Sequence, residues 1–291
     1  MGACWCRIDG PLDETVPARR AITPRDLLTF TFGFGAMTEM FTSPTPWPVV
    51  VEADRLRLAT IGPPDPDVQP EPDTWIRNLG TLPLLAQPGE RWLYNTGASV
   101  LGVLLGRATG QPLADVLRTR IFEPLGMRDT GFWTPHLERL ATAYRPTADG
   151  LASWDEPDGA WSRPPAFGDG AAGLVSTVDD LHAFARMLLD RGAPVLGADD
   201  VHAMTSDQLT DTQKAHGGLE EDFFDGGRSW GFCQAVYADG SFGWDGGFGT
   251  SWLVDPARDL AVIVLTQRAF ESPRTPLVHR EIRDAAHAAL A

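Results

Sequence analysis

The last third of the chain alternates short strand-like runs with turn signals, and this pattern restricts the possible folds more than any other feature. Three strand runs and two intervening turns follow one another: residues 231–237, 238–240, 250–254, 255–256 and 260–266. Connections this short join antiparallel neighbours in a sheet. An amphipathic helix over residues 276–290 follows, and it is suited to packing on one face of that sheet. The pattern predicts an α+β fold in which helices flank an antiparallel sheet.

Upstream of these strands the sequence carries clear helix signals. Thr23 precedes Pro24, and Asp26 stands at the third helical position, which is the pattern of a capped helix start. Farther along, apolar residues with helical spacing lead up to Gly110, and Pro112 opens an adjoining helix. The sequence therefore predicts several helices before the sheet.

A further helix is expected after Thr177, with Gly192 as its left-handed stop. Two stretches that are rich in proline and acidic residues or glycine, 44–72 and 141–170, are expected to be irregular surface loops. The sequence shows no internal repeat and no low-complexity run. The hydrophobic content of 43% allows either one large domain or two lobes.

The charge and the cysteine content exclude several classes of function. The chain has 39 acidic and 24 basic residues and a net charge of −15, which repels phosphate backbones, so nucleic acid is excluded as a partner. No apolar run reaches the length of about 18 residues that a membrane span needs. Three cysteines make no disulfide framework, and the N-terminus lacks the layout of a signal peptide. These features predict a cytoplasmic protein and leave its oligomeric state open.

The common catalytic signatures are absent from the sequence. It has no G-x-S-x-G elbow, no H-E-x-x-H and no Walker loop. The six histidines lack metal-ligand spacing, so neither a metal nor a cofactor is expected. Ser99 and Ser251 each follow a glycine two positions earlier but lack the trailing glycine. A hydrolase with a Ser–His–Asp triad built on either serine is one alternative.

Five segments follow one another in a fixed order. They are residues 22–29 (ITPRDLLT), 88–97 (PGERWLYNTG), 121–130 (IFEPLGMRDT), 173–177 (GLVST) and 243–247 (GWDGG). Together with the strands and the final helix, from Arg7 onward they resemble the class C β-lactamase, DD-peptidase and family VIII carboxylesterase group. The resemblance implies a β-lactamase/DD-peptidase-like fold, with a helical lobe beside the antiparallel sheet, in one domain over residues 1–291 that is incomplete at its N-terminus.

The resemblance also implies an acyl-transfer mechanism. In the family a serine in an S-x-x-K motif attacks an ester or amide carbonyl, and a lysine and a tyrosine manage its proton. Tyr94 matches the tyrosine of the Y-x-N motif, whose phenol pKa a nearby cation lowers toward neutrality. By itself Tyr94 would be interpreted as a core tyrosine that enters a helix. The surrounding segment 88–97 favours the catalytic role.

Asn95 and Thr96 follow Tyr94 in this motif. The family's third residue is typically asparagine, and Thr96 takes its place, so a hydroxyl replaces the amide that contacts the acyl group. Asn95 would supply a neighbouring polar group. Both residues are therefore expected to contribute to substrate binding.

The third family motif, K-T-G, appears as Trp244-Asp245-Gly246, which is expected to bind substrate on an edge strand. Gly247 would donate its N–H to the oxyanion hole. Trp244 replaces the lysine that would hold a substrate carboxylate, which favours ester substrates. A strand bulge at the paired glycines is the structural alternative, and it is compatible with the same strand.

Four tryptophans lie near these motifs in the sequence and permit an aromatic acyl pocket: Trp92, Trp230, Trp244 and Trp252. Core packing is the general expectation for such residues.

The nucleophile motif itself is missing from the sequence. No S-x-x-K occurs, and the only lysine, Lys214, has Asp211 at the position that the serine would require. In the family this motif lies upstream of the segment matching 22–29, on a helix that follows two strands. The resemblance implies that the chain lacks those N-terminal strands and that helix, which leaves apolar surface and an unpaired strand edge. Residues 1–6, with two cysteines and a tryptophan, are expected to be an out-of-frame translation of the upstream region.

These observations predict a serine hydrolase whose intact form hydrolyses small-molecule esters or amides through an acyl-enzyme, with carboxylesterase-like preference. The chain as given is expected to be inactive. One alternative is a non-catalytic lactamase-like binding protein, and another is β-lactamase or DD-peptidase activity. An S-x-x-K in the DNA upstream would distinguish a broken enzyme from a binding protein.

Overall fold

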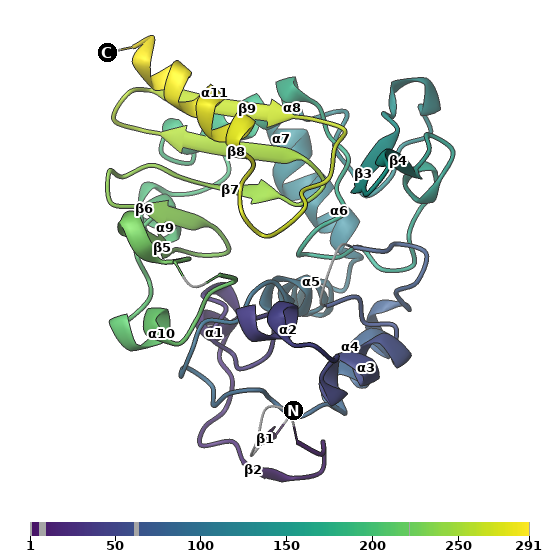
Figure 1. Cartoon of the computed structure of the whole chain (residues 1–291). Coiled ribbons are helices and arrows are strands. Elements are labelled where there is room, and N and C mark those ends of the chain that lie inside the picture. Colours follow the sequence, from purple (N-terminus) through teal and green to yellow (C-terminus); the bar gives the residue numbers. More distant parts are fainter. Residues whose placement is uncertain (1, 6–9, 61–63, 221, 291) are drawn as a thin grey trace. The chain divides into compact units, whose positions relative to one another are not determined.

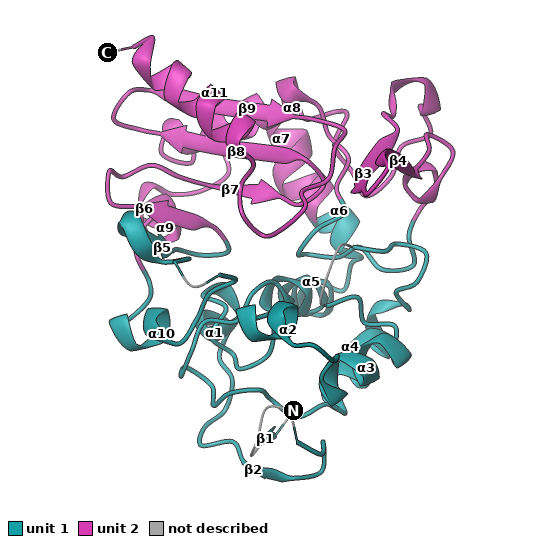
Figure 2. Cartoon of the chain, viewed as in Figure 1, with its two compact units in different colours: residues 1–116, 165–173, 208–233 teal, residues 117–164, 174–207, 234–291 magenta. Residues whose placement is uncertain are grey.

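The computed structural model describes residues 2–5, 10–60, 64–220 and 222–290 (Figure 1). They form two compact units, which Figure 2 colours separately. Unit 1 comprises Met1–Val116, Pro165–Gly173 and Gln208–Cys233, and unit 2 comprises Leu117–Pro164, Leu174–Asp207 and Gln234–Ala291. Each unit is thus assembled from stretches that are distant in sequence. The interpretation of residues 1–291 as one domain stays a prediction.

Unit 1 is mainly helical. Its elements are β1 (Ala3–Trp5), β2 (Thr15–Pro17), α1 (Pro24–Leu28), α2 (Thr38–Thr42), α3 (Pro48–Arg55), α4 (Pro72–Gly80), α5 (Thr96–Thr109), α6 (Leu113–Leu117, whose last residue begins unit 2), α10 (Asp211–Ala215), η4 (Asp225–Gly227) and β5 (Arg228–Trp230). Strands β1 and β2 pair antiparallel, with Cys4 opposite Val16. Cys4 and Trp5 are buried in the core of this unit, whereas Met1 and Cys6 lie outside the described residues. The out-of-frame origin of residues 1–6 stays a prediction.

The helix starts and stops predicted in unit 1 are confirmed. Thr23 caps α1 by accepting a hydrogen bond from the Asp26 N–H, and the Asp26 carboxylate accepts one from the Thr23 N–H at 2.8 Å. Helix α5 ends at Gly110, whose φ of 68° is the left-handed conformation that favours glycine. Helix α6 begins directly after Pro112.

The prediction of an irregular loop over residues 44–72 is wrong in part, because α3 forms within it. Pro48 stands at the first helical turn, where a missing N–H costs nothing. Val49 and Ala53, four residues apart, are both buried on the inner face of the helix. The many prolines of the stretch obscured this short apolar pattern.

The core of unit 1 contains several large aromatic side chains. The Trp75 ring on α4 stacks on Phe167 with a centroid distance of 5.0 Å, and its Nε1–H donates to the Leu58 carbonyl at 2.9 Å. The Asp169 carboxylate accepts a hydrogen bond from Gln69 at 3.0 Å, and burial raises the pKa of this carboxyl. These contacts fix residues 165–173 against the N-terminal part of the unit.

Unit 2 contains most of the sheet and the helices that cover it. Its elements are η1 (Arg118–Phe122, a π-helical turn), α7 (Glu123–Leu125), η2 (Leu137–Arg139), β3 (Ala143–Thr147), β4 (Gly150–Asp155), η3 (Ala160–Ser162), α8 (Val178–Leu189), α9 (Ala198–Met204), β6 (Ala235–Tyr237), β7 (Phe242–Gly246), β8 (Thr250–Asp255), β9 (Leu260–Leu265) and α11 (Leu277–Ala288). Strands β6 to β9 lie side by side in chain order, each antiparallel to the next.

Helices α8 and α11 pack on opposite faces of this sheet. Successive strand residues point to opposite faces, so Phe242, Trp244, Trp252 and Val254 share one face. Phe242 and Val254 belong to the core cluster that contains Met187 and Leu188 of α8. Asp245 and Ser251 are paired on the other face, where both meet Arg283 of α11. The predicted strands 250–254 and 260–266 and the helix 276–290 are confirmed as β8, β9 and α11.

Thr177 caps α8, as predicted, by accepting a hydrogen bond from the Asp180 N–H. The helix ends at Leu189, and the first residue with a positive φ after it is Arg191 (58°), followed by Gly192 (96°), so the predicted left-handed stop lies one residue earlier than expected. The predicted strand 231–237 is wrong in its first half, since β6 begins only at Ala235. Cys233 has a φ of 57°, which is incompatible with an extended strand.

The prediction of a loop over residues 141–170 is also wrong in part, because β3 and β4 form a hairpin there. Tyr144 lies opposite Ser153, and Gly150 closes the turn with a φ of 120°. Most side chains of the hairpin are exposed or half-buried. It therefore lacks the strict alternation by which a half-buried strand is recognised in a sequence.

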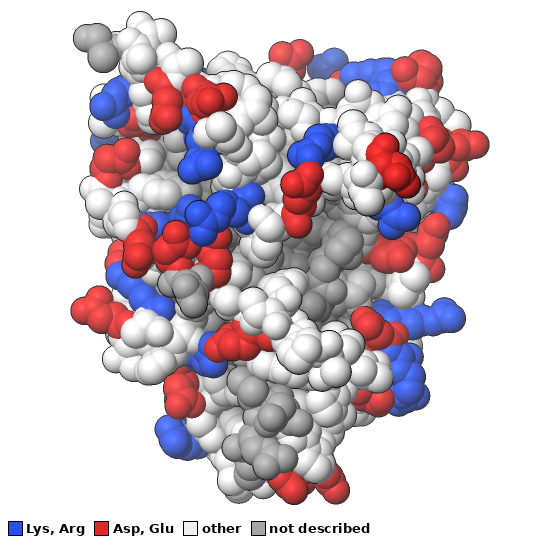
Figure 3. All heavy atoms as spheres, viewed as in Figure 1, with Lys and Arg blue, Asp and Glu red and all other residues white. Residues whose placement is uncertain are grey.

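No helix among the described residues is long and apolar enough to cross a membrane. On the face drawn in Figure 3, acidic side chains lie beside most of the basic ones. Ion pairs between arginines and carboxylates include Arg107 with Asp73 at 2.7 Å and Arg186 with Asp190 at 2.9 Å. The exclusion of a nucleic-acid partner rests on the net charge and stays a prediction.

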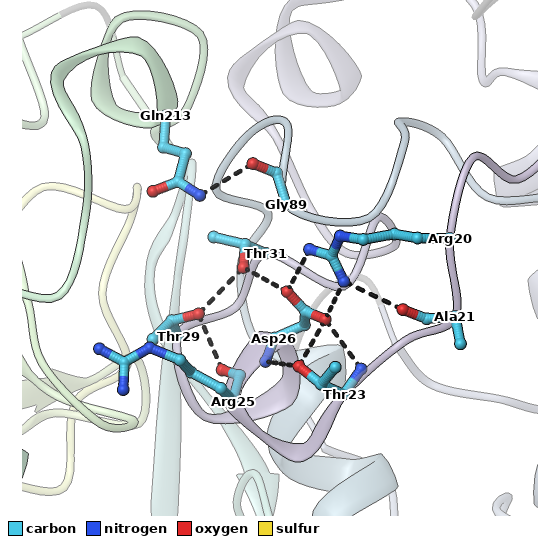
Figure 4. A network of polar contacts seen from close by, with 9 residues as sticks. All are labelled: Arg20, Ala21, Thr23, Arg25, Asp26, Thr29, Thr31, Gly89 and Gln213. Atoms are coloured by element: carbon cyan, nitrogen blue, oxygen red, sulfur yellow. Dashed lines mark hydrogen bonds and ion pairs between the residues drawn. The ribbon is translucent and has the colours of Figure 1, made fainter.

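A polar network fixes the start of α1 in unit 1 (Figure 4). The Arg20 guanidinium donates to both carboxylate oxygens of Asp26, at 2.6 and 2.7 Å. The Thr23 hydroxyl donates to the same carboxylate at 2.7 Å. Burial alone would raise the pKa of the Asp26 carboxyl, but the hydrogen bonds from Arg20 and Thr23 outweigh it and hold that pKa below its ordinary value. Asp26 is therefore an anchor for α1 in its ionised form.

Replacing Asp26 with asparagine is expected to lower the free energy of unfolding of unit 1 at pH 7 by about 2 kcal/mol, because a charge-assisted bidentate pair is lost while Arg20 stays partly hydrated. Since the folded pKa lies below the ordinary 3.8, the stabilisation is present above pH 4 and is lost as the pH falls through the folded pKa. Urea unfolding of both proteins between pH 7 and pH 3 measures this. The difference in free energy of unfolding between the two proteins should narrow below pH 4. A difference that is constant with pH would contradict the role of the ionised Asp26 carboxylate.

Candidate functional site

The backbone of Tyr94 is held by the segment 30–36 of unit 1. The Ala36 N–H donates to the Tyr94 carbonyl at 3.0 Å, and the Tyr94 N–H donates to the Ala36 carbonyl at 2.9 Å. The Leu93 N–H donates to the Phe30 carbonyl at 2.8 Å. Gly35 permits this close approach, because a Cβ there would lie 2.5 Å from the Tyr94 carbonyl oxygen. The backbone of Tyr94 is therefore held in place against the segment 30–36.

Aromatic rings surround the Tyr94 side chain. The ring centroids of Phe30, Trp92 and Trp230 lie 6.1, 5.8 and 6.4 Å from that of Tyr94. These three neighbours are buried, whereas Tyr94 is half-buried. Trp92 and Trp230 are fully buried, which is the core packing generally expected for these tryptophans, and they form a packed wall beside Tyr94. The phenol ring thus lies against a buried apolar surface.

Asn95 has an unusual backbone conformation next to Tyr94. Its φ of 76° and ψ of −56° are those of a γ-turn with positive φ. The Thr96 N–H closes the turn by donating to the Tyr94 carbonyl at 3.1 Å. A non-glycine residue in this region is strained, and such strain concentrates at functional sites. The sharp turn connects the extended Tyr94 segment directly to the first residue of α5.

Asn95→Gly is expected to be more stable to unfolding than Asn95→Ala by about 1–2 kcal/mol, because glycine reaches a positive φ without the clash of a Cβ. Urea unfolding of the two variants measures the difference. Equal stabilities would show that the turn is not strained in solution.

The substrate-binding roles of Asn95 and Thr96 stay predictions. Asn95 is half-buried, and its side chain makes no capping hydrogen bond to α5. Thr96 is completely buried, with 0% of its surface exposed, and its hydroxyl has no hydrogen-bond partner among the described residues. A buried hydroxyl without a hydrogen-bond partner lowers the free energy of unfolding. Thr96 therefore places an unsatisfied polar group among buried residues.

The segment Trp244-Asp245-Gly246 lies in strand β7 of unit 2. The expectation of an edge strand is wrong for the start of β7, where Phe242 and Gly243 pair with β6. Trp244, Asp245 and Gly246 pair with Trp252, Ser251 and Thr250 of β8. The motif thus occupies the end of β7, beyond the residues that β6 covers.

A tight turn connects β7 to β8 and contains Gly247. The Gly246 carbonyl accepts a hydrogen bond from the Gly249 N–H at 2.9 Å across this turn. In a trans peptide the N–H points opposite to the carbonyl, so the Gly247 N–H points away from the turn. Gly247 is exposed, and no backbone carbonyl among the described residues accepts its N–H. This geometry permits donation to a ligand, and the oxyanion role stays a prediction.

The Asp245 side chain faces helix α11. Its carboxylate accepts hydrogen bonds from Arg283 and from the Thr275 hydroxyl. Arg283 also donates to the Ser251 hydroxyl, so it connects β7 and β8 on the face of the sheet that α11 covers. Sequence reasoning missed Arg283 and Thr275. The four-residue spacing of His279, Arg283 and His287 would have indicated a polar helix face.

A second aromatic group at the β7–β8 turn was also missed. The Phe248 ring stacks on Trp154 with a centroid distance of 4.3 Å and meets the Trp161 ring edge-on at 5.4 Å. Trp154 belongs to the β3–β4 hairpin, and Phe248 directly follows Gly247. The hairpin is thereby attached to the turn that carries the predicted oxyanion donor.

Two of the five sequence segments have a structural role within unit 2. Gly131 and Val175 exchange backbone hydrogen bonds at 3.1 and 2.8 Å. The Thr130 hydroxyl lies 2.8 Å from that of Ser176 and donates to the buried Asp180 carboxylate at 2.7 Å. These contacts hold the start of α8 against the end of the segment 121–130.

The alternative nucleophiles Ser99 and Ser251 are both buried, with 2% and 1% of their surface exposed. Ser99 hydrogen-bonds to the buried Asp169 carboxylate. Ser251 accepts a hydrogen bond from Arg283, which would leave its oxygen poorly nucleophilic. The burial and the partners of both serines argue against a triad built on either one.

The predicted site residues therefore fall into two groups. Tyr94, Asn95 and Thr96 are contiguous in unit 1, and the residues from Trp244 to Gly247 are contiguous in unit 2. Each group contains a hydrogen-bonded turn, the γ-turn at Asn95 and the turn from Gly246 to Gly249 that contains Gly247. Joint action of the two groups is a proposal.

Comparison with protein families identifies one match over nearly the whole chain. The family model described as Beta-lactamase matches residues 7–287. An uncharacterized protein of Mycobacterium tuberculosis is 36% identical over 277 residues, which cover 89% of this chain and 65% of the relative. Esterase EstB of Burkholderia gladioli is 32% identical over 245 residues, which cover 74% of this chain and 59% of the esterase. The chain thus spans about two thirds or less of the length of these relatives.

Solved structures show the same fold. EstCE1, described as a hydrolase with promiscuous acyltransferase activity, superimposes with a TM-score of 0.75 and 26% identity, over 94% of this chain and 74% of EstCE1. Simvastatin synthase (LovD) from Aspergillus terreus superimposes with a TM-score of 0.74 and 24% identity, over 100% of this chain and 73% of LovD. The arrangement of helices and antiparallel sheet predicted from the sequence is that of these proteins.

Proposed function

The chain belongs to the Beta-lactamase family of serine hydrolases, and from this premise we propose that it is part of an enzyme that hydrolyses small-molecule acyl esters through an acyl-enzyme. The likeness to esterase EstB supports ester hydrolysis. The mechanism uses no cofactor. It needs a nucleophilic serine, a group that takes up the serine proton, and donors for the oxyanion.

Tyr94 takes up the proton in this proposal. Its backbone is fixed by Ala36, its ring lies against Trp92, and the strained turn at Asn95 follows it. As the serine oxygen adds to the ester carbonyl carbon, its proton passes to the phenolate, and the alcohol then leaves with that proton. Water repeats the sequence on the acyl-enzyme and releases the acid. The Gly247 N–H stabilises the oxyanion in both steps.

The main support for an ester substrate is that β7 has no lysine at the position of the K-T-G motif. Trp244 stands where related lactamases carry a lysine, so the strand supplies no ammonium for a substrate carboxylate. The Arg283 guanidinium behind the strand is already engaged by Asp245. A neutral ester therefore suits this strand better than an anionic β-lactam or a peptide terminus.

The nucleophile is proposed to come from outside these 291 residues, because no S-x-x-K occurs within them. A comparison of p-nitrophenyl acyl esters with a chromogenic β-lactam, on a form of the protein that includes such a segment, tests the proposal. Ester turnover at least about tenfold above lactam turnover in kcat/KM is expected, given the missing charge-assisted contact. Preferential lactam turnover would contradict it, and absence of both activities would favour the non-catalytic binding protein.

A further inference from the structure

Helix α11 meets the sheet through a stripe of polar side chains. His279, Arg283 and His287 repeat every four residues and lie on one face of the helix. All three are buried or half-buried, whereas Val278 and Ile282 on the outer side are 51% and 39% exposed. Hydrogen bonds and ion pairs have preferred directions that apolar contacts lack. The polar stripe therefore fixes α11 in a single register on the strands.

His279 contacts the end of the β7–β8 turn. Its Nε2 lies 3.2 Å from the Gly249 carbonyl oxygen, so the proton is assigned to Nε2. The same carbonyl also accepts from the Thr266 N–H at 3.0 Å and from the Thr266 hydroxyl at 2.8 Å. Gly249 has a φ of 107°, and a Cβ there would lie 2.3 Å from the Arg268 carbonyl oxygen. The end of the turn is thus held by three donors around one oxygen.

Arg283 contacts the start of the turn, one helical turn farther along α11. It donates to the Asp245 carboxylate, whose second oxygen accepts from the Thr275 hydroxyl at 2.5 Å. Arg283 and Asp245 are both largely buried, with 13% and 12% of their side-chain surface exposed. A buried charge pair with additional hydrogen bonds has one preferred geometry. Asp245 precedes Gly246 by one residue, so the strand is fixed immediately before the turn.

We propose that α11 is a positioning element for the Gly246–Gly249 turn, with His279 and Arg283 as its positioning residues. The two side chains hold the turn at both ends, and the Gly246 carbonyl to Gly249 N–H bond sets the peptide plane between them. The Gly247 N–H is thereby kept pointing outward. The link to oxyanion stabilisation rests on the proposed function, whereas the ordering of the turn does not.

Backbone hydrogen exchange on the 291-residue chain tests the ordering directly. His279→Leu removes the donor but keeps an apolar side chain of similar size, and Arg283→Met removes the charge. Each is expected to raise the exchange rate of the amides in residues 246–250 by about tenfold, because the turn loses one of its two anchors. Exchange in β9 and in α5 should stay within about twofold of the unsubstituted chain.

Two further variants distinguish positioning from general destabilisation. His279→Gln keeps a side-chain N–H donor and should return the turn to within about threefold of the original rate. Arg280→Met removes the charge of an exposed arginine on the same helix and should leave the turn unchanged. The proposal is overturned if Arg280→Met has the same effect, if His279→Gln does not rescue, or if exchange rises equally across β8 and β9.

The catalytic consequence is measured separately, in a form of the protein that hydrolyses esters. His279→Leu is expected to lower kcat by about tenfold and to leave KM within about twofold, since the turn contributes mainly to the transition state. A disordered turn with unchanged kcat would overturn the positioning role. Because the exchange experiment needs no turnover, failure of the ester proposal would be seen independently of it.

Discussion

Replacing Tyr94 with phenylalanine is expected to lower kcat/KM for ester hydrolysis by about 10²–10⁴-fold in a form of the protein that includes an S-x-x-K segment, because the phenol oxygen that takes up the serine proton is lost. The ring itself is retained, so packing against Phe30, Trp92 and Trp230 is preserved. The free energy of unfolding should therefore change little. Steady-state kinetics on a p-nitrophenyl ester measures the effect.

The chain offers a matched control in Tyr144, which lies on strand β3. Tyr144→Phe makes the same chemical change outside the predicted site and should leave kcat/KM within about twofold. Activity that survives Tyr94→Phe at the same level as Tyr144→Phe would show that another group takes up the proton.

Gly35→Ala is expected to lower the free energy of unfolding by about 2–4 kcal/mol, because the added Cβ has no space and the backbone no allowed conformation. Gly35 has a φ of 153°, and the Cβ would lie 2.5 Å from the Tyr94 carbonyl oxygen and 2.8 Å from the Leu93 carbonyl carbon. Both contacts are with backbone, which cannot rotate away as a side chain can. Thermal and urea unfolding measure the loss.

Gly80→Ala is the control for Gly35→Ala. Gly80 is the last residue of α4, and a Cβ there meets no heavy atom within 4 Å. This change is expected to stabilise the protein by about 0.5–1 kcal/mol, because alanine loses less backbone entropy in a helix. If Gly35→Ala were tolerated as well as Gly80→Ala, the close approach of segment 30–36 to Tyr94 would be contradicted.

The elements that the sequence predicted well are those with strong local signals. Thr23 and Thr177 are capping residues, and each accepts the expected hydrogen bond from an N–H three residues later. Strands β8 and β9 are joined by a short turn, so pairing and direction follow from the chain itself. These features depend only on residues that are close together in the sequence, so the sequence alone is sufficient to predict them.

The elements that were missed depend on tertiary contacts. The β3–β4 hairpin is attached through the Trp154–Phe248 stack, which joins residues far apart in sequence. The amphipathic pattern of residues 276–290 predicted a helix, but it did not reveal that the polar stripe of α11 faces the sheet. That orientation depends on Asp245, whose partner Arg283 is distant along the chain.

The sequence predicted which residues belong to the candidate site, but it did not predict their conformations or their contacts. The motif match identified Tyr94 and Gly247. It gave no indication that Asn95 forms a strained γ-turn or that Thr96 is completely buried. Backbone strain arises from the surrounding structure, which over-determines the conformation, so a sequence pattern does not report it.

Labelling with a fluorophosphonate probe tests whether the nucleophilic serine lies outside these 291 residues, because the probe forms a covalent bond only with an activated serine. We expect no labelled serine in the 291-residue chain. In a form that includes the S-x-x-K motif we expect a single label on the serine of that motif, with labelling slowed by Tyr94→Phe. Stoichiometric labelling of Ser99 or Ser251 in the chain as given would contradict this expectation.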